Sequence, residues 1–188
     1  MVVVNEEIKQ VVRVSNAVNL AALNALFIAR KAGAVALGFG VVSAELRAFS
    51  QQLEVVMNRL TQQVFGLLAA VSEHAREWKR YAKHLNAADK GTHSRRYLAA
   101  MLERMSGHID QSQELIAGQQ QRLVEGIERA HKLCNSGLAI SRAAKIEAVY
   151  GQQMAGGLRQ VAEEVEQAIG DIAATLKTLR QQLTRPAH

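Results

Sequence analysis

Aromatic residues, proline and cysteine are all scarce in this chain of 188 residues. Aromatic residues make up 4% of it, and Pro186 is the single proline. A compact domain of mixed helices and strands normally uses more aromatic side chains in its core and more prolines at its turns. No stretch alternates between apolar and polar residues with period two, so strands are not expected. The composition predicts an all-α protein.

Cys134 is the only cysteine, which excludes an intramolecular disulfide and is typical of a reducing compartment. Its position on an apolar helical stripe predicts a small buried side chain rather than a reactive thiol. The uninterrupted apolar segments are far shorter than the ~20 residues that span a bilayer, and the first residues lack the pattern of a signal peptide. We therefore expect a cytoplasmic protein without a transmembrane segment.

The chain is basic, with a net charge of +6 and a pI near 9.8. Its basic residues are spread along the sequence and form no continuous run, so a nucleic-acid-binding tail is not expected. The densest cluster flanks one predicted turn and comprises Arg76, Lys79, Arg80, Lys83, Lys90, Arg95 and Arg96. It is interpreted either as the solvated end of a bundle or as a surface for an anionic partner.

Four helices are predicted from apolar residues that recur at alternating intervals of three and four, the heptad pattern of a coiled-coil bundle. The first seam is Val4, Ile8, Val11, Ser15, Val18, Ala22, Ala25, Ala29 and Ala32. The second runs from Phe39 to Leu85, with a predicted stutter at Val56, Leu60 and Val64. The third includes Leu123, Gly126, Ala130, Leu133, Gly137, Ile140, Ala144 and Glu147, and the fourth Leu158, Val161, Val165, Ala168, Ile172, Thr175, Leu179 and Leu183.

Glycine-marked reversals separate these helices. Gly33 and Gly38 bound the first turn, Gly151 and Gly157 bound the second, and residues 87–94 read as a loop. We expect one elongated helical domain over 1–188, made of a first hairpin over 1–86 and a second over 95–188. The fold class is a long antiparallel four-helix coiled-coil bundle, with helices two and three projecting as a two-helix stalk.

The two hairpins also resemble each other, which suggests an internal duplication. Asn19–Gly33 aligns with Gly137–Gly151, and one extra residue in the second reversal then aligns Phe39 with Leu158. Because heptad helices share apolar positions in any case, the glycine-bounded turn is the more specific part of this match.

Residues 14–49 resemble the cytoplasmic signalling tip of bacterial chemoreceptors, the methyl-accepting chemotaxis proteins. The matching residues are Asn19, Leu20, Ala22, Leu23, Asn24, Ala25, Ala29, Ala32, Gly33, Gly38, Phe39, Val41, Val42, Glu45 and Arg47. In that family the tip hairpin binds a histidine kinase and a coupling adaptor, and receptor dimers associate there. The resemblance implies a signalling or scaffold protein, and a duplicated chain would resemble the receptor dimer in one polypeptide.

The resemblance also implies a contact surface at the tip, made of Asn19, Leu20, Leu23, Asn24, Lys31, Val35, Leu37, Phe39 and Val41. The polar tip of the family is replaced here by Ala34-Val35-Ala36-Leu37. An apolar tip backed by Phe39 predicts a site for proteins, for a membrane or for self-association. The expected partners are proteins, among them a chemotaxis-type kinase, an adaptor or receptors.

No motif for catalysis, phosphate binding or dinucleotide binding is present, so an enzyme, a metal site and a cofactor are not expected. His74, Trp78, Tyr81 and His84 lie on the predicted stalk. They leave open a ligand- or cofactor-sensing bundle, although a seam histidine beside Trp78 is also what a stalk core contains. An anionic-surface binder that uses the basic cluster remains a further alternative.

Overall fold

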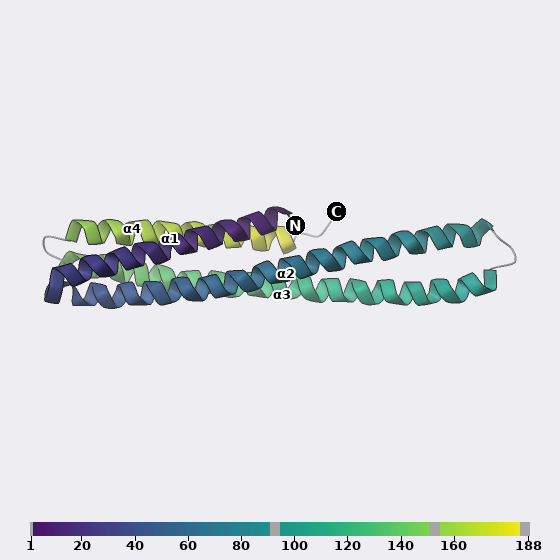
Figure 1. Ribbon diagram of the computed structural model, residues 1–188, viewed down its shortest axis with the longest axis horizontal. Helices are drawn as coiled ribbons and strands as arrows, with labels where there is room; N and C mark the ends of the chain where they lie inside the picture. The colour runs from purple at the N-terminus through teal and green to yellow at the C-terminus, as the bar shows by residue number, and fades with distance from the viewer. Residues whose placement is uncertain (1, 91–94, 151–154, 185–188) are drawn as a thin grey trace. The chain divides into compact units, whose positions relative to one another are not determined.

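The computed structural model describes residues 2–90, 95–150 and 155–184, and in 2–3, 34–35, 88–90 and 95–97 it describes the backbone alone. Its elements are α1 (Val2–Ala32), the 3₁₀-helix η1 (Gly33–Ala36), α2 (Leu37–Lys90), α3 (Arg95–Ala148) and α4 (Ala155–Thr184) (Figure 1). The four α-helices pack against one another as an all-α four-helix bundle. The predicted fold class is confirmed.

Contacts divide the chain into two compact units. Unit 1 comprises Met1–Thr61 and Val124–His188, and therefore contains α1, α4 and the adjoining parts of α2 and α3. Unit 2 comprises Gln62–Leu123 and contains segments of α2 and α3 alone. The boundary thus falls within two continuous helices and not in the predicted loop, of which residues 87–90 belong to α2. The projecting stalk stays a prediction.

The core of unit 1 is a set of heptad seams. On α1 the predicted seam from Val4 to Ala29 is buried at every position. Ala32 at its end is half-buried. Since alternating steps of three and four keep a stripe on one side of a helix, each such seam faces the other three helices continuously. The prediction for α1 is confirmed.

On α4 and on much of α3 the predicted seam is wrong by one residue at alternate positions: the buried residues are Cys134, Ser141 and Ala148 on α3, and Ala162, Ile169 and Leu176 on α4. On α2 the predicted Val42 and Phe49 are buried together with their neighbours Ser43 and Ser50, and Met57 is buried in place of Val56. With Met57 in place of half-buried Val56, the steps on α2 stay regular and the predicted stutter is absent. Adjacent apolar residues both lie near the seam, and the neighbouring helix decides which one is enclosed.

The buried seams of the two hairpins correspond at one constant separation along the chain. Ala25 corresponds to Ala144, Phe39 to Leu158 and Leu53 to Ile172, and all six are buried. The predicted alignment placed Ala29 opposite Glu147, whereas the buried residue at that level is Ala148. No extra residue is therefore needed in the second reversal to match the two hairpins.

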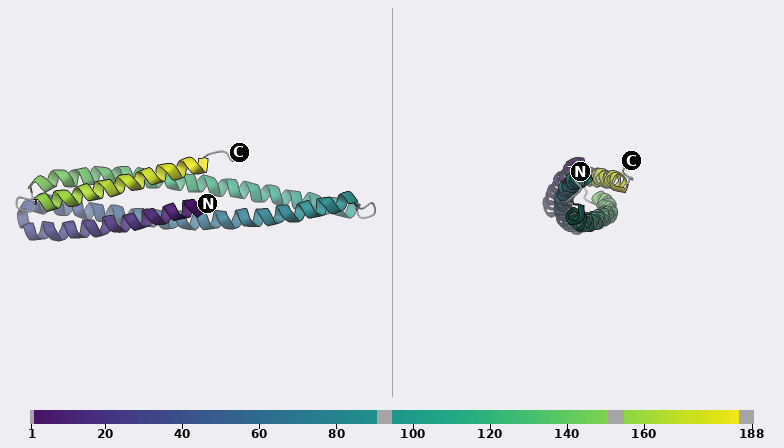
Figure 2. Two further views of the ribbon diagram at one scale, coloured as in Figure 1. Left: turned by 90° about the horizontal axis from the view of Figure 1, so that it is seen from above. Right: turned by 90° about the vertical axis from the view of Figure 1, so that its right-hand side faces the viewer.

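The first reversal depends on Gly33. Its φ of 71° lies in the left-handed region, which a glycine after a helix end adopts without strain. Gly38, predicted to belong to the turn, instead lies in the first turn of α2, where the Glu147 carboxylate occupies the space that a Cβ would fill. Gly157 is part of α4, and Gly151 lies outside the described residues. Because α2 begins where α3 ends, the two hairpins lie side by side in unit 1, and α1 contacts α4 (Figure 2).

Phe49 packs into a hole on α3 that Gly137 provides. A Cβ on Gly137 would lie 2.7 Å from two ring carbons of Phe49, closer than real side chains approach. The ring is buried, with 3% of its surface exposed, so it cannot move aside into solvent. The absence of a side chain at Gly137 therefore sets how closely α2 and α3 approach at this level.

We expect Gly137→Ala to destabilise the protein, because overpacking a core typically costs about 1–3 kcal/mol. Gly170→Ala is the matched control, since a Cβ there meets no atom within 4 Å. This second change should stabilise α4 by about 0.5–1 kcal/mol through helix propensity. Urea denaturation followed by circular dichroism measures both. Equal effects of the two substitutions would contradict the conclusion that Gly137 makes room for the Phe49 ring.

Four serines are buried within the described core, namely Ser15, Ser43, Ser50 and Ser141. Ser15 and Ser50 join α1 to α2 by reciprocal bonds. Ser50 Oγ donates to the Ser15 carbonyl at 2.7 Å, and Ser15 Oγ lies 3.2 Å from both the carbonyl and the Oγ of Ser50. A paired polar contact inside an apolar seam penalises other registers, in which the hydroxyls would lose their partners.

Ser15→Ala and Ser50→Ala should each lower the free energy of unfolding by about 1 kcal/mol. The double substitution should cost less than the sum of the two, because no hydroxyl is then left without its partner. A double-mutant cycle from chemical denaturation gives the coupling. Strict additivity would show that the two hydroxyls do not interact.

Unit 2 has a thinner core than unit 1. Of its described side chains, the buried apolar ones are Val64, Leu67, Ile109 and Leu123. Two helices can cover each other's seam from one side only, which leaves other seam residues in contact with water. Val71, Trp78 and Leu85, all predicted seam residues, are 42%, 54% and 48% exposed.

One described helix segment, Val4–Ala32 of α1, is long and apolar enough to cross a membrane by length and composition, with a mean hydropathy of 1.5. The core helix of a bundle meets the same test, and α1 has a continuous buried seam. The expected absence of a transmembrane segment therefore stays a prediction.

Candidate functional site

The outer surface of the first hairpin carries large apolar side chains in contact with water. Leu20 and Phe27 on α1 are 60% and 62% exposed, and Leu37 and Val41 on α2 are 70% and 61% exposed. We call these four residues the apolar face. Leu20 and Phe27 are seven residues apart and therefore lie on the same side of α1, opposite its buried seam. The face belongs entirely to unit 1.

The sequence around the apolar face contains few charged residues. Between Val14 and Ala44 the sequence contains only two charged residues, Arg30 and Lys31. Both are exposed and both are basic. A surface helix of a bundle normally carries charged residues opposite its core stripe. The first hairpin departs from that pattern, which is typical of a surface that contacts another molecule.

The second hairpin supplies an internal comparison, because its core positions match those of the first. At the positions that correspond to Leu20, Leu37 and Val41 it has Ala139, Gly156 and Gln160. Its outer surface also carries ion pairs, among them Arg159 Nε with Glu163 at 3.0 Å. Two hairpins with the same buried pattern thus differ on the outside, so the bundle core does not require an apolar outer surface.

The structure exposes some of the predicted contact residues and buries others. Leu20, Asn24, Lys31, Leu37 and Val41 are exposed, and Asn19 and Leu23 are half-buried. Phe39 is buried, with 1% of its surface exposed, and so is Ala36. Phe39 is therefore wrong as a contact residue, because the first turn of α2 points it into the core. The side chain of Val35 lies outside the described residues.

Phe27 was missed by the sequence analysis. The resemblance to the chemoreceptor tip assigned no role to this position, so only its spacing from Leu20 could have identified it. On the second hairpin Ile146, Val149 and Tyr150 are also exposed, at the end of α3. They border a cavity of about 530 Å³ that Arg142, Lys145 and Arg159 also line.

Glu166 on α4 neutralises part of the positive charge near that cavity. It accepts hydrogen bonds from Lys145 and from Arg142, the latter at 3.3 Å. These two cations on α3 lower the pKa of Glu166, with the Lys145 hydrogen bond as the main cause. The ion pairs therefore tie α3 to α4 and leave less free charge than the sequence suggests.

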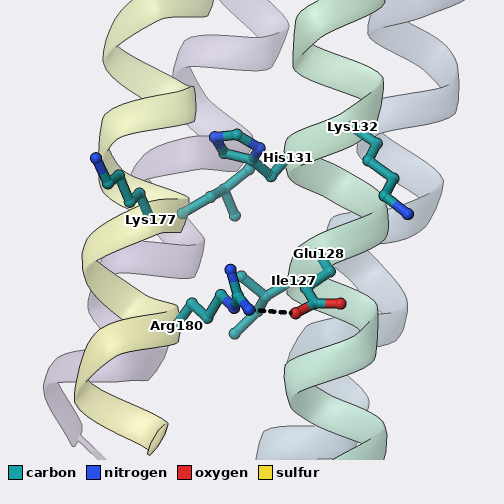
Figure 3. A pocket seen from close by; sticks show the side chains of 7 residues that line it. Ile127, Glu128, His131, Lys132, Lys177 and Arg180 are labelled. Atoms are coloured by element: carbon teal, nitrogen blue, oxygen red, sulfur yellow. Dashed lines mark ion pairs between the residues drawn. The ribbon is translucent and has the colours of Figure 1, made fainter.

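A groove of about 400 Å³ lies between α3 and α4 in unit 1 (Figure 3). Buried Ile127 and Leu176 line it, and Arg180 bonds to Glu128 at 2.8 Å across it. Figure 3 shows His131 pointing towards α4, whereas Lys132 and Lys177 point away from the groove. The size suits a small ligand. The cations do not converge there, and the arginine is already paired.

The aromatic and histidine residues of the predicted stalk belong to unit 2. His74 Nδ1 lies 2.6 Å from Ser112 Oγ on α3, and Ser112 Oγ also donates to the Ile109 carbonyl at 2.9 Å. The rings of Trp78 and Tyr81 are 5.8 Å apart. No group of three or more potential metal ligands occurs among the residues described. His74 thus has a structural partner that explains its position.

The basic cluster is only partly described. Arg76, Lys79, Arg80 and Lys83 are exposed, and Arg76 pairs with Glu73 at 3.3 Å. The side chains of Lys90, Arg95 and Arg96 lie outside the described residues. The four described cations spread over the outer surface of α2 without forming a cavity of their own.

Cys134 is fully buried in the seam of α3, as predicted. Burial raises the pKa of its thiol to about 12, because the apolar surroundings disfavour the thiolate. The thiolate is the reactive form, so this cysteine is inert in the folded protein.

We expect the folded protein to react with dithiobis(nitrobenzoic acid) at least ~100-fold more slowly than the protein in denaturant. The release of thionitrobenzoate measures both rates. Because the unfolded thiol ionises more easily than the folded one, stability should also decrease as the pH rises above about 8.5. A fast reaction without denaturant would contradict the burial of Cys134.

No family model, curated protein or solved structure matches the chain. The similarity of residues 14–49 to the chemoreceptor tip therefore depends on those residues alone. Of the residues that carry it, Ala22, Ala25, Ala29, Phe39 and Val42 are buried, and they build the hairpin rather than its surface.

Proposed function

We propose that this chain is a chemoreceptor-like signalling or scaffold protein of the cytoplasm, which binds partner proteins through the apolar face of its first hairpin. Its activity is binding and not catalysis. The partners that the resemblance suggests are a chemotaxis-type histidine kinase, its coupling adaptor or receptors. The observation that carries the proposal is the exposure of Leu20, Phe27, Leu37 and Val41 on one hairpin of the bundle.

The apolar face has a free-energy cost in water that the core does not explain. Burying a large aliphatic or aromatic side chain gains about 1.5–3 kcal/mol relative to leaving it exposed. The second hairpin keeps the same buried seam with smaller or polar residues at three of the four corresponding outer positions. The apolar side chains therefore support a role outside the bundle, in contact with a partner.

The rigid core beneath the apolar face favours tight binding. Ala22, Ala25 and Ala29 are buried under α1, and their small side chains let the helices pack closely. A face held by such a core loses little conformational entropy when a partner binds. The residues shared with the chemoreceptor tip include these alanines, so the resemblance supports the same use of the hairpin.

The two alternatives have weaker support. A ligand- or cofactor-sensing role would need a site around His74 and His84, but His74 already bonds to Ser112. A role in binding anionic surfaces would use Arg76, Lys79, Arg80 and Lys83, which are exposed but do not converge. Neither has an observation comparable to the apolar face.

The test is the affinity of the purified chain for a purified chemotaxis histidine kinase and for a coupling adaptor, measured by biolayer interferometry. Leu20→Gln and Phe27→Gln together should weaken binding by about tenfold or more, because each removes an apolar contact with the partner. The control is Ala139→Gln at the corresponding position of the second hairpin, which should leave the affinity unchanged. Circular dichroism confirms that the variants remain helical.

Two results would contradict the proposal. If the wild-type chain binds neither the kinase nor the adaptor, the chemoreceptor-like partners are wrong. If it binds but the apolar-face variant binds equally well, the contact surface lies elsewhere.

A further inference from the structure

Helix α2 continues its heptad pattern into unit 2 without the helix that covers it in unit 1. In unit 1 the positions of Ser43, Ser50 and Met57 recur every seven residues and are buried, and Ser50 is bonded to Ser15 of α1. The same heptad position continues on α2 as Val64, Val71, Trp78 and Leu85. The last three are exposed, because unit 2 contains no part of α1 or α4.

These residues belong to a longer apolar stripe on α2, which we call the open seam. It consists of Leu68, Val71, Ala75, Trp78, Ala82 and Leu85, at alternating intervals of three and four. All six are exposed or half-exposed, and none is charged. Charged side chains lie on a different side of α2 and α3 in unit 2, where Glu77, Arg80 and His108 border a cavity.

A seam of this kind normally faces another helix. Heptad spacing keeps a stripe in line with a neighbouring helix over many turns, a feature with no use on a solvated surface. A stripe that extends for about five turns and includes a tryptophan is larger than the scattered apolar residues of an ordinary surface. The open seam therefore needs a helical partner of the kind that α1 supplies in unit 1.

We propose that the open seam of one chain binds the open seam of a second copy, with the two α2 helices antiparallel. The intervals of the stripe read the same in both directions, so a reversed copy presents residues at matching levels. Such a pairing places Trp78 opposite Ala75 of the partner subunit and Ala82 opposite Val71 of the partner subunit. At these two levels a large side chain meets a small one, and Leu68 and Leu85 of the two copies meet at the ends of the stripe.

The lack of charge on the open seam also favours a second copy. A binding surface for a different protein commonly selects its partner through complementary charges. Here the recognition depends on shape and apolar contact, and a twofold interface uses the same surface on both subunits. A stable interface needs roughly 800 Å² from each partner, or about 20–30 residues a side. The six residues of the open seam would form the centre of such an interface, with its rim supplied by the adjoining turns of α2 and α3.

Trp78 is the only tryptophan of the chain, so its fluorescence reports directly on the open seam. Sedimentation equilibrium of the full chain should give a monomer–dimer equilibrium. The emission of Trp78 should shift to longer wavelength on dilution over the same concentration range, because water reaches the indole in the monomer. A monomer at all concentrations, with constant emission, would overturn the proposal.

Ala75→Glu is the variant that tests the geometry. It places a carboxylate against Trp78 of the partner subunit and should raise the dissociation constant of the dimer by about 100-fold or more. Ala69→Glu is the matched control, because Ala69 is exposed on the outer side of α2 away from the open seam. It should leave the dimer unchanged. Equal effects of the two substitutions, or none, would overturn the assignment.

A mixing experiment separates a second copy from any other partner. In the antiparallel arrangement the two Ala75 positions lie within one helical turn of each other across the twofold axis. Ala75→Glu and Ala75→Lys chains should each be monomeric alone and should form a mixed dimer when combined, because the opposite charges pair. If mixing does not restore the dimer, the antiparallel pairing of the α2 helices is wrong.

Discussion

The structure depends on one constraint, which is that each helix keeps its buried residues at alternating intervals of three and four. In unit 1 this pattern holds on α1, α2, α3 and α4, so four seams meet along a common core. The seams contain few large side chains near the first reversal, where Ala22, Ala25 and Ala29 lie. Close approach of the helices follows from these alanines and from Gly137, which makes room for Phe49. The reciprocal Ser15–Ser50 contact then favours one register of α1 against α2.

The outer surfaces are free of that constraint, so apolar residues exposed there are candidates for contact with other molecules. The two hairpins share their heptad pattern of buried positions but differ outside, where the first has Leu20 and Val41 and the second has Ala139 and Gln160. Since the second hairpin keeps the buried pattern without these apolar outer residues, the core does not explain them. The open seam on α2 in unit 2 is a second case, because Val71, Trp78 and Leu85 follow the core pattern without a covering helix. The protein therefore presents two apolar surfaces of different origin, one outside a complete bundle and one where the bundle is incomplete.

Prediction from the sequence succeeded on α1 from Val4 to Ala29, where the alternating steps of three and four identified the buried residue even beside larger apolar neighbours such as Leu23 and Ile28. It failed on α2 at Val56 and Met57 and on α4 at Ala168 and Ile169, where two adjacent residues are both apolar. At the site the error came from the resemblance and not from the heptad pattern. Phe39 was assigned to the contact surface and is buried, whereas Phe27 was passed over and is exposed.

The all-helical class, the number of helices, the reversal at Gly33 and the buried state of Cys134 could be predicted from local sequence patterns. These follow from local causes: composition, heptad spacing, and the backbone freedom of a glycine with a φ of 71°. The packing of the helices determines which of two neighbouring apolar residues enters the core, where the hairpins match, and which apolar residues remain in water. The reason is that a helix has two sides next to its seam, and only the packing of another helix determines which of them is covered.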